Sequence, residues 1–430
     1  MLYYSTNNRQ ATTDFRGAAM EGQPADKGLY FPERIPQLSS QLFNNIDRYS
    51  RADLAFEVIR PYTGDSLPED VLQTIVRETV DFEFPLVLVD EDISSLELYH
   101  GPTLAFKDVG ARFMSRCLGY FARGENRPMT VLVATSGDTG GAVANAFAGV
   151  EGVSVIILYP SGKVSHVQEL QLTTLGGNIK ALEIDGSFDD CQRLVKQAFT
   201  DAELNRLYLL TSANSINVAR WLPQQFYYFF AWQQWPDKQR PPVISVPSGN
   251  FGNLCAGLLA ERSGLLVQHF LAACNANDSV PQFLSNGDYH PKKAIPTLSN
   301  AMDVGDPSNF VRLLELFGHD LVSIQKILSG YTVTDERTRE VIRDLYQQKN
   351  YLADPHGAVG YEALRQYLDA HPGNKGFFLE TAHPVKFFDV VEPVTGTPVP
   401  LPDPVKALLD KKKNAERLPA SFDALKQWMK

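Results

Sequence analysis

The sequence has few features of a secreted, membrane-bound or metal-binding protein. Only four of its 430 residues are cysteines, and none stands in a C-x-x-C spacing, so we expect buried thiols and no metal site. The aromatic run 226–232 (FYYFFAW) is far too short to cross a bilayer and predicts a buried helix. Residues 1–15 lack the basic start and the apolar core of a signal peptide. These features predict a cytoplasmic protein.

Positive charge is also scarce. The chain has 40 lysines and arginines against 50 acidic residues, which gives a formal net charge of −10. Its one basic cluster, residues 411–413, is expected on a solvated helix, so nucleic acid is not an expected partner. A chain of 430 residues is too long for one ordinary domain and predicts two or three.

The pattern of the chain changes at about residue 90. Residues 1–90 carry helical patterns and many prolines, which predict a separate, mostly helical N-terminal domain. Residues 91–430 alternate apolar runs with helical stretches, as in parallel βαβ units of the α/β class. Within them we expect a smaller mobile subdomain at about 110–225 and a larger subdomain formed by the remainder. The clearest strands are expected at 131–134, 153–158, 179–184, 243–246 and 377–379.

One lysine in an apolar run is the clearest chemical signal. In the segment 100–108 (HGPTLAFKD), Lys107 directly follows the apolar residues 104–106. Desolvation disfavours the ammonium form and lowers the pKa of an amine. A neutral amine can attack an aldehyde and form a Schiff base, as pyridoxal phosphate requires. The alternative is a lysine whose stem only covers a core helix.

A glycine-rich loop provides a second signal. The segment 248–253 (SGNFGN) follows the apolar run 243–246 and precedes an apolar helical pattern. Gly249 and Gly252 leave the loop amides uncovered, and these amides and the helix N-terminus can hold a phosphate dianion. Such loops are common in α/β proteins, but together with Lys107 this one predicts the phosphate anchor of a phosphorylated aldehyde.

A third loop, residues 135–141 (TSGDTGG), follows the apolar run 131–134. The hydroxyls of Thr135, Ser136 and Thr139 and the open glycine amides could hold a carboxylate at a helix N-terminus. The alternative is a β–α turn in which a serine or threonine caps the helix. The number of hydrogen-bonding groups in one turn favours a ligand.

Five segments occur in the order in which they occur in threonine synthases. They are HGPTLAFKD, TSGDTG, NSINVAR (214–220), PSGNFGN and TAHPVKF (381–387). The segments GLYFPE, LYPSGKVS and TLGGNI are similar to the longer bacterial and fungal branch of that family. The resemblance covers nearly the whole chain. It implies the tryptophan-synthase-β-like fold (fold type II) of pyridoxal-phosphate enzymes.

The resemblance also implies which residues bind the cofactor, pyridoxal 5'-phosphate. Lys107 would form the Schiff base and later move protons. Thr381 would hydrogen-bond the pyridine nitrogen, where a neutral hydroxyl gives a weaker electron sink than a carboxylate. Asp138 stands where shorter relatives carry an asparagine near the cofactor's 3-hydroxyl. The residues implied to hold the cofactor phosphate are Gly249, Asn250, Phe251, Gly252 and Asn253.

The substrate implied by the resemblance is O-phospho-L-homoserine. Asn214, Ser215 and Arg220 would bind its phosphate, for which arginine offers an always-charged, bidentate fork. Its α-carboxylate would be bound by the hydroxyls of Thr135, Ser136 and Thr139. His100 either orients the cofactor loop or is only a histidine of the core.

The implied activity is that of a carbon–oxygen lyase, threonine synthase, in the last step of threonine biosynthesis. O-phospho-L-homoserine and water give L-threonine and phosphate by γ-elimination and β-addition of water. One alternative is a related phospho-lyase that releases 2-oxobutanoate, ammonia and phosphate, because the motifs do not separate the two. The other is a catalytically idle scaffold, against which the intact Lys107 and glycine loop argue. The sequence leaves the oligomeric state open between monomer and dimer.

Overall fold

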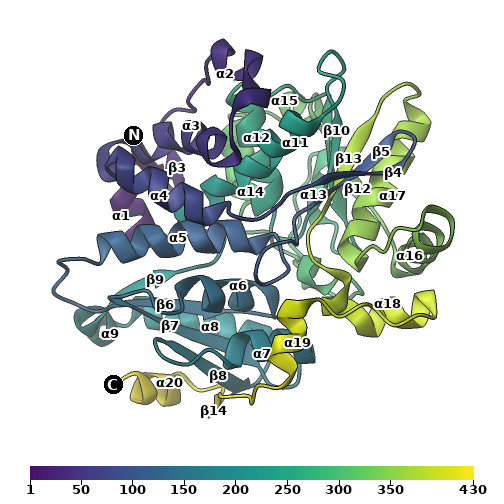
Figure 1. The fold of residues 1–430 in the computed structure, drawn as a ribbon. Coiled ribbons are helices and arrows are strands. Elements are labelled where there is room, and N and C mark those ends of the chain that lie inside the picture. The colour runs from purple at the N-terminus through teal and green to yellow at the C-terminus, as the bar shows by residue number, and fades with distance from the viewer.

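Two sheets of mainly parallel strands organise the chain, and a small antiparallel sheet lies near the N-terminus (Figure 1). The computed structural model describes residues 1–430. Strands and helices alternate from about residue 93 onward, so the predicted βαβ construction is confirmed. No helix is both long enough and apolar enough to span a membrane.

The N-terminal residues form three strands and four α-helices. The strands pair in the order β2-β1-β3, a sheet that the sequence pattern did not predict. Helix α3 begins after the N-cap Ser50, whose side chain accepts a hydrogen bond from the backbone N–H of Asp53. The elements are β1 (Leu2–Ser5), β2 (Asn8–Asp14), α1 (Phe15–Glu21), β3 (Tyr30–Pro32), α2 (Ser40–Asn44), α3 (Arg51–Thr63) and α4 (Glu69–Thr79).

The larger sheet has the strand order β12-β11-β10-β13-β5-β4. All neighbouring pairs are parallel except β4 and β5, which form an antiparallel pair. The side chains of β10, β11 and β13 are buried throughout, as expected for apolar strands covered on both faces. The strands are β4 (Leu86–Asp90), β5 (Ile93–Glu97), β10 (Val243–Pro247), β11 (His269–Cys274), β12 (Leu328–Thr332) and β13 (Gly376–Glu380).

The smaller sheet has the order β14-β8-β7-β6-β9, with every pair parallel. Strand β14 comes from the C-terminal end of the chain, which the predicted division gave to the larger subdomain. The division into domains stays a prediction. It differs from the structure at the C-terminal end of the chain, where β14 belongs to the smaller sheet. The strands are β6 (Met129–Ala134), β7 (Val153–Pro160), β8 (Ile179–Asp185), β9 (Leu209–Ser212) and β14 (Glu416–Pro419).

Helices connect the strands of both sheets. The aromatic run lies in α11, where residues 226–232 are all buried, which confirms the predicted core helix. The helices between β5 and β10 are α5 (Lys107–Phe121), α6 (Asp138–Phe147), α7 (His166–Thr173), α8 (Phe188–Thr200), α9 (Ala202–Leu207), α10 (Val218–Trp221), η3 (Leu222–Gln225) and α11 (Phe226–Gln234).

The remaining helices follow β10. Helix α16 begins after Thr334, whose hydroxyl accepts from the N–H of Arg337. The expectation that residues 411–413 lie on a helix is wrong, because they fall in the exposed segment between α19 and β14. The α-helices are α12 (Gly252–Arg262), α13 (Ser279–Asn286), α14 (Phe310–Leu316), α15 (Leu321–Gln325), α16 (Asp335–Lys349), α17 (Pro355–Ala370), α18 (Phe388–Thr395), α19 (Asp403–Leu409) and α20 (Phe422–Met429); the short helix η5 (Pro384–Phe387) precedes α18.

Candidate active site

Three neighbouring parallel strands of the larger sheet end at the same edge. Strand β5 leads to the segment around Lys107, β13 leads to Thr381, and β10 leads to the glycine loop 248–253. Ligands of parallel α/β sheets bind outside the carboxyl ends of the strands. The topology therefore brings together the three segments for which the sequence predicts a cofactor.

The smaller sheet brings its two loops together in the same way. Strands β6 and β9 are parallel neighbours, and their carboxyl ends lead to the loop 135–141 and to the segment 214–220. Asp138 of the first loop and Arg220 of the second segment both contact Lys107, which belongs to the first helix after the larger sheet's β5. These contacts join the ligand loops of the two sheets.

The backbone at Lys107 is held from three sides. The N–H of Phe106 donates to the carbonyl oxygen of Thr381 at 2.8 Å, and the hydroxyl of Tyr227 donates to the carbonyl oxygen of Phe106. Arg220 donates from Nη1 to the carbonyl oxygen of Lys107 at 2.9 Å. The starting point of the Lys107 side chain is therefore fixed by groups from β13, α11 and α10.

The amine of Lys107 lies in a largely desolvated place. Its side chain is 18% exposed, and Nζ lies 3.9 Å from Oδ2 of Asp138 and 4.8 Å from the centre of the Phe106 ring. Burial lowers the pKa of Lys107; the nearby carboxylate of Asp138 opposes this shift, and the charge of Lys386 adds to it. A lowered pKa leaves a larger share of the amine neutral and able to attack an aldehyde.

Asp138 is bound by a second lysine that the sequence analysis did not single out. Lys386 in η5 has a fully buried side chain, and its Nζ lies 2.7 Å from Oδ1 of Asp138. The side-chain amide of Gln168 donates to the same oxygen at 2.9 Å. Burial alone would raise the pKa of Asp138, but the charges of Lys386 and Lys107 hold it well below the ordinary carboxyl value. A signal for Lys386 exists in the sequence, because it too stands in a largely apolar run (residues 384–388).

The glycine loop presents open backbone donors. Phe251 adopts the left-handed conformation (φ 61°) and is the N-cap of α12, which turns the chain sharply between Gly249 and Gly252. The backbone N–H groups of residues 249–251 donate no hydrogen bond within the chain. Asn253 accepts from the hydroxyl of Tyr228 at 2.9 Å, and its buried Nδ2 has no partner. Free amides at a helix N-terminus fit a phosphate dianion.

Ser215 connects the glycine loop to the segment 214–220. Its hydroxyl oxygen accepts from Nδ2 of Asn250 at 2.9 Å and from Nδ2 of Asn309 at 3.0 Å. Asn250 is held in turn by the N–H of Ser308, which donates to its Oδ1 at 2.6 Å. A hydroxyl that accepts twice keeps its own proton for a third partner. Ser215 can therefore still donate to an anion.

Arg220 and Asn214 stand at opposite ends of their segment. Arg220 is 4% exposed, and burial lowers the pKa of its guanidinium to about 10. Its Nη1 is bound to Lys107, whereas its buried Nε has no hydrogen-bond partner. Asn214 is half-buried. A buried guanidinium with a donor to spare is suited to an anionic ligand.

The loop 135–141 uses its three hydroxyl groups differently. Thr135 is buried, and its hydroxyl oxygen accepts from the N–H groups of Gly137 at 3.0 Å and Gly140 at 2.9 Å. This is the capping arrangement that the sequence analysis held as the alternative to ligand binding. Ser136 is exposed and Thr139 is half-buried. The hydroxyls of these two residues are the ones that remain accessible in this loop.

A buried acidic group lies next to Thr381. Oε1 of Glu380 accepts from the N–H of Asp354 at 2.6 Å, and its Oε2 is buried without a partner. Burial, together with the neighbouring charge of Asp354, raises the pKa of Glu380 well above its ordinary value. Thr381 itself is buried, at 7% exposure. The carboxyl group of Glu380 thus ties the strand end that carries this hydroxyl to the start of α17.

The two histidines near these segments have structural partners. Nε2 of His100 lies 2.7 Å from Oε2 of Glu97. His383 accepts at Nδ1 from the N–H of Val385 at 3.1 Å, and burial lowers its pKa to about 4. His383 is therefore neutral at physiological pH and caps η5.

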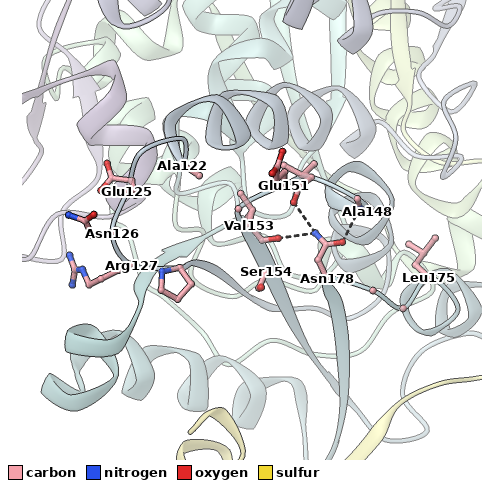
Figure 2. A pocket seen from close by; sticks show the side chains of 16 residues that line it. Ala122, Glu125, Asn126, Arg127, Ala148, Glu151, Val153, Ser154, Leu175 and Asn178 are labelled. Carbon is pink, nitrogen blue, oxygen red and sulfur yellow. Dashed lines mark hydrogen bonds between the residues drawn. The ribbon is translucent and has the colours of Figure 1, made fainter.

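A separate surface cavity of about 610 Å³ lies at the opposite edge of the smaller sheet (Figure 2). Its lining residues precede strands β6, β7 and β8 or, like Val153 and Ser154, begin β7, and none of them is a predicted site residue. The side-chain amide of Asn178 donates to the carbonyl oxygens of Phe147 and Val153, both at 2.8 Å. Asn178 thereby ties together the loops that form the cavity floor.

Comparisons with known proteins agree with this geometry. Residues 95–377 match the family model of pyridoxal-phosphate dependent enzymes. Residues 2–80 match the model of the threonine synthase N terminus, and residues 357–429 match the model of the threonine synthase C-terminal part.

Individual relatives match over the full length. The chain is 44% identical to the threonine synthase of Escherichia coli K12, over 100% of this chain and 99% of the relative. The structural alignment with the crystal structure of the Escherichia coli enzyme covers 100% of this chain and 99% of that enzyme's chain, with a TM-score of 0.93. The structure of pyridoxal-phosphate-bound threonine synthase from Brucella melitensis is 35% identical and has a TM-score of 0.94, with coverage of 100% and 98%.

The fold and the site define a pyridoxal-phosphate-dependent enzyme of fold type II, with the tryptophan-synthase-β-like architecture that the sequence predicted. Its desolvated lysine, open glycine loop and buried carboxylate fit that cofactor. The matches at both ends of the chain and over its full length identify the family within this class. The chain belongs to the threonine synthases, of the long type found in Escherichia coli.

Proposed function

We propose that this chain converts O-phospho-L-homoserine and water into L-threonine and phosphate. The observation that carries the proposal is two groups of open donors at the strand ends around one desolvated lysine, linked by the hydrogen bond from Asn250 to Ser215. The open amides of residues 249–251 form one group, and Arg220 with Ser215 forms the other. A phosphorylated cofactor and a phosphorylated substrate require two such groups.

Lys107 is the proposed attachment point of pyridoxal phosphate and the group that moves protons. When bound, the cofactor supplies an electron sink for the carbanions of the reaction. The cofactor phosphate is assigned to the loop residues, and the pyridine nitrogen to the hydroxyl of Thr381. Asp138 is proposed to lie beside the cofactor's 3-hydroxyl, which its 3.9 Å distance from Nζ of Lys107 supports. The loop residues are Gly249, Asn250, Phe251, Gly252 and Asn253.

The substrate phosphate is assigned to Asn214, Ser215 and Arg220. The unpartnered Nε of Arg220 and the spare proton of Ser215 support this role. Because Arg220 also binds the carbonyl oxygen of Lys107, it would hold the leaving phosphate in a fixed position relative to the base, Lys107. Such fixed orientation is a main source of catalysis in a reaction of several proton transfers.

The α-carboxylate is assigned to the loop 135–141. Ser136 and Thr139 would donate from their hydroxyls, together with the glycine amides at the start of α6. Thr135 contributes differently, because its hydroxyl oxygen already accepts two loop amides. We propose that Thr135 shapes the loop and that the other two hydroxyls contact the substrate.

The proposed proton transfers use the amine of Lys107, with bound pyridoxal phosphate as the electron sink. The amine of Lys107 would take the proton from Cα and then one from Cβ of the substrate, after which phosphate leaves Cγ. The lysine would deliver one proton to Cγ, which becomes the methyl group, and water would add its hydroxyl at Cβ. A second proton would then return to Cα, so that both removed protons are accounted for. A lysine whose pKa is lowered by burial can serve as base and acid near neutral pH.

Product analysis tests the proposed function. Purified protein loaded with pyridoxal phosphate is given O-phospho-L-homoserine, and threonine, 2-oxobutanoate and phosphate are quantified. We expect threonine and phosphate in equal amounts, and neither product from Lys107→Ala. 2-Oxobutanoate as the main product would identify a phospho-lyase, and no turnover would identify a scaffold. The cytoplasmic location and the oligomeric state, monomer or dimer, stay predictions.

A further inference from the structure

Lys386 has no role in the chemistry assigned above, yet it is a fully buried ionic group near Lys107. Its side chain is 0% exposed, and its Nζ contacts Oδ1 of Asp138 at 2.7 Å and the carbonyl oxygen of Thr103 at 2.8 Å. Burying an ammonium is costly unless it is paired and hydrogen-bonded. The contacts with Asp138 and Thr103 offset that cost, and Asp138 also lies next to Lys107.

The two lysines share one carboxylate but not equally. Asp138 lies 2.7 Å from Nζ of Lys386 and 3.9 Å from Nζ of Lys107. The shorter contact is a direct charge-assisted hydrogen bond, whereas the longer one is beyond hydrogen-bonding distance. Gln168 occupies the same Oδ1 from α7, so the carboxylate is held in place by η5 and α7 and not by Lys107.

We propose that Lys386 is a positioning residue that neutralises Asp138 and thereby leaves the amine of Lys107 free to react. Without Lys386, the nearest cation for the Asp138 carboxylate would be Lys107. An ion pair there would favour the ammonium form, which cannot attack an aldehyde. The proposal rests on the assignment of Lys107 as the cofactor-binding lysine.

The charged groups that face Lys107 give the direction of the effect. Asp138 on α6 and Asp354 at the start of α17 raise the pKa of Lys107, whereas burial, Lys386 on η5 and Arg220 on α10 lower it. Replacing Lys386 with glutamine removes one lowering charge and releases the Asp138 carboxylate. Both changes raise the pKa of Lys107.

The experiment measures Lys107 in the full-length protein without cofactor. Competitive labelling with acetic anhydride from pH 6 to 10, read by mass spectrometry, gives the apparent pKa of Lys107. The variants are Lys386→Gln, Asp138→Asn and the double variant. The matched control is Lys180→Gln, because Lys180 is exposed on β8. This readout needs no cofactor and no turnover.

The proposal expects the apparent pKa of Lys107 to rise in Lys386→Gln by about one unit, which means about tenfold less neutral amine near pH 8. It expects a fall in Asp138→Asn, and a value near that of the parent in the double variant. Addition of pyridoxal phosphate should be about tenfold slower in Lys386→Gln at pH values below the measured pKa of Lys107 in the parent, and should recover at pH values above the pKa measured in the variant. The control should match the parent throughout.

Two outcomes overturn the proposal. One is an unchanged pKa of Lys107 in Lys386→Gln; the other is an equal shift in Lys386→Gln and in the double variant, as a purely structural role predicts. If Lys386→Gln does not fold, the apparent pKa of Lys107 is compared between Asp138→Asn and the double variant. It must be higher in the double variant. Peptide mapping of the reduced cofactor adduct in the parent tests the Lys107 assignment independently.

Discussion

Arg220 donates a hydrogen bond of 2.9 Å from Nη1 to the backbone carbonyl oxygen of Lys107. These residues come from segments more than a hundred positions apart, one following the smaller sheet and the other following the larger sheet. The contact links the proposed substrate-phosphate group directly to the backbone of Lys107.

Arg220→Ala should keep bound pyridoxal phosphate and lose use of the phosphorylated substrate. Losing a charge-assisted contact costs about 1.5–3 kcal/mol, so kcat/KM for O-phospho-L-homoserine should fall roughly ten- to a hundredfold. Steady-state kinetics and the visible cofactor spectrum check this. Arg206→Ala is the control, because Arg206 is exposed on α9 and should behave like the parent.

Inorganic phosphate gives a second reading of the same group. It should inhibit the parent competitively and inhibit Arg220→Ala far less. Loss of the cofactor from Arg220→Ala, or kinetics equal to those of the parent, would contradict the assignment of Arg220 to the substrate phosphate.

Gly249→Ala should weaken cofactor binding. A Cβ at this position would lie 2.6 Å from Cα of Met302 and 2.9 Å from the carbonyl oxygen of Ala301. Because both atoms belong to the backbone, the loop must move, and its open amides move with it. We expect at least about a tenfold increase in the Kd for pyridoxal phosphate, equivalent to about 1.4 kcal/mol. Fluorescence titration measures it; an unchanged Kd would exclude these amides as the phosphate site.

The hydroxyl of Thr381 should matter for rate more than for binding. Thr381→Val keeps the shape of the buried side chain but removes the proposed partner of the pyridine nitrogen. One neutral hydrogen bond contributes about 0.5–1.5 kcal/mol, so kcat should fall by up to roughly tenfold. Thr381→Ser should restore most of it. Equal kcat values in the valine variant and the parent would remove this role.

Part of the candidate site could be predicted because three of its segments follow an apolar run. The run 243–246 and its glycines marked β10 and the loop after it, and the runs at 131–134 and 377–379 marked β6 and β13 in the same way. Local patterns of this kind do not depend on distant residues. The prediction of Lys107 as a desolvated amine also rested on its neighbours alone.

Other features depend on contacts that the local pattern does not encode. Strand β14 pairs with β8, more than two hundred residues earlier in the chain, and four exposed or half-buried residues give little sign of such a partner. The ion pair of Lys386 with Asp138 likewise joins two distant segments. The hydroxyl oxygen of Thr135 accepts from the N–H groups of Gly137 and Gly140, contacts that the residue type alone does not predict. Its contact with the substrate stays a prediction.

Glu380→Gln should change how stability depends on pH. Burial raises the pKa of Glu380 well above that of the unfolded chain, about 4.3. The native state then binds more protons, so the free energy of unfolding of the parent falls as the pH rises from that value through the native pKa. The glutamine variant lacks this loss, because its amide is neutral at every pH.

Urea unfolding midpoints at pH 4.5 and pH 8 measure this difference. The midpoint of Glu380→Gln relative to the parent should increase between the two pH values. A constant difference would mean that Glu380 is ionised in the folded protein. Glu336→Gln is the control, because Glu336 is exposed on α16.

The attachment point of the cofactor tests the account most directly. Two lysines lie next to Asp138, and only Lys107 has a partly exposed side chain, 18% against 0% for Lys386. Protein loaded with pyridoxal phosphate is reduced with borohydride, digested and mapped by mass spectrometry. The account predicts a single modified peptide with the adduct on Lys107. An adduct on Lys386 or on any other lysine would contradict it.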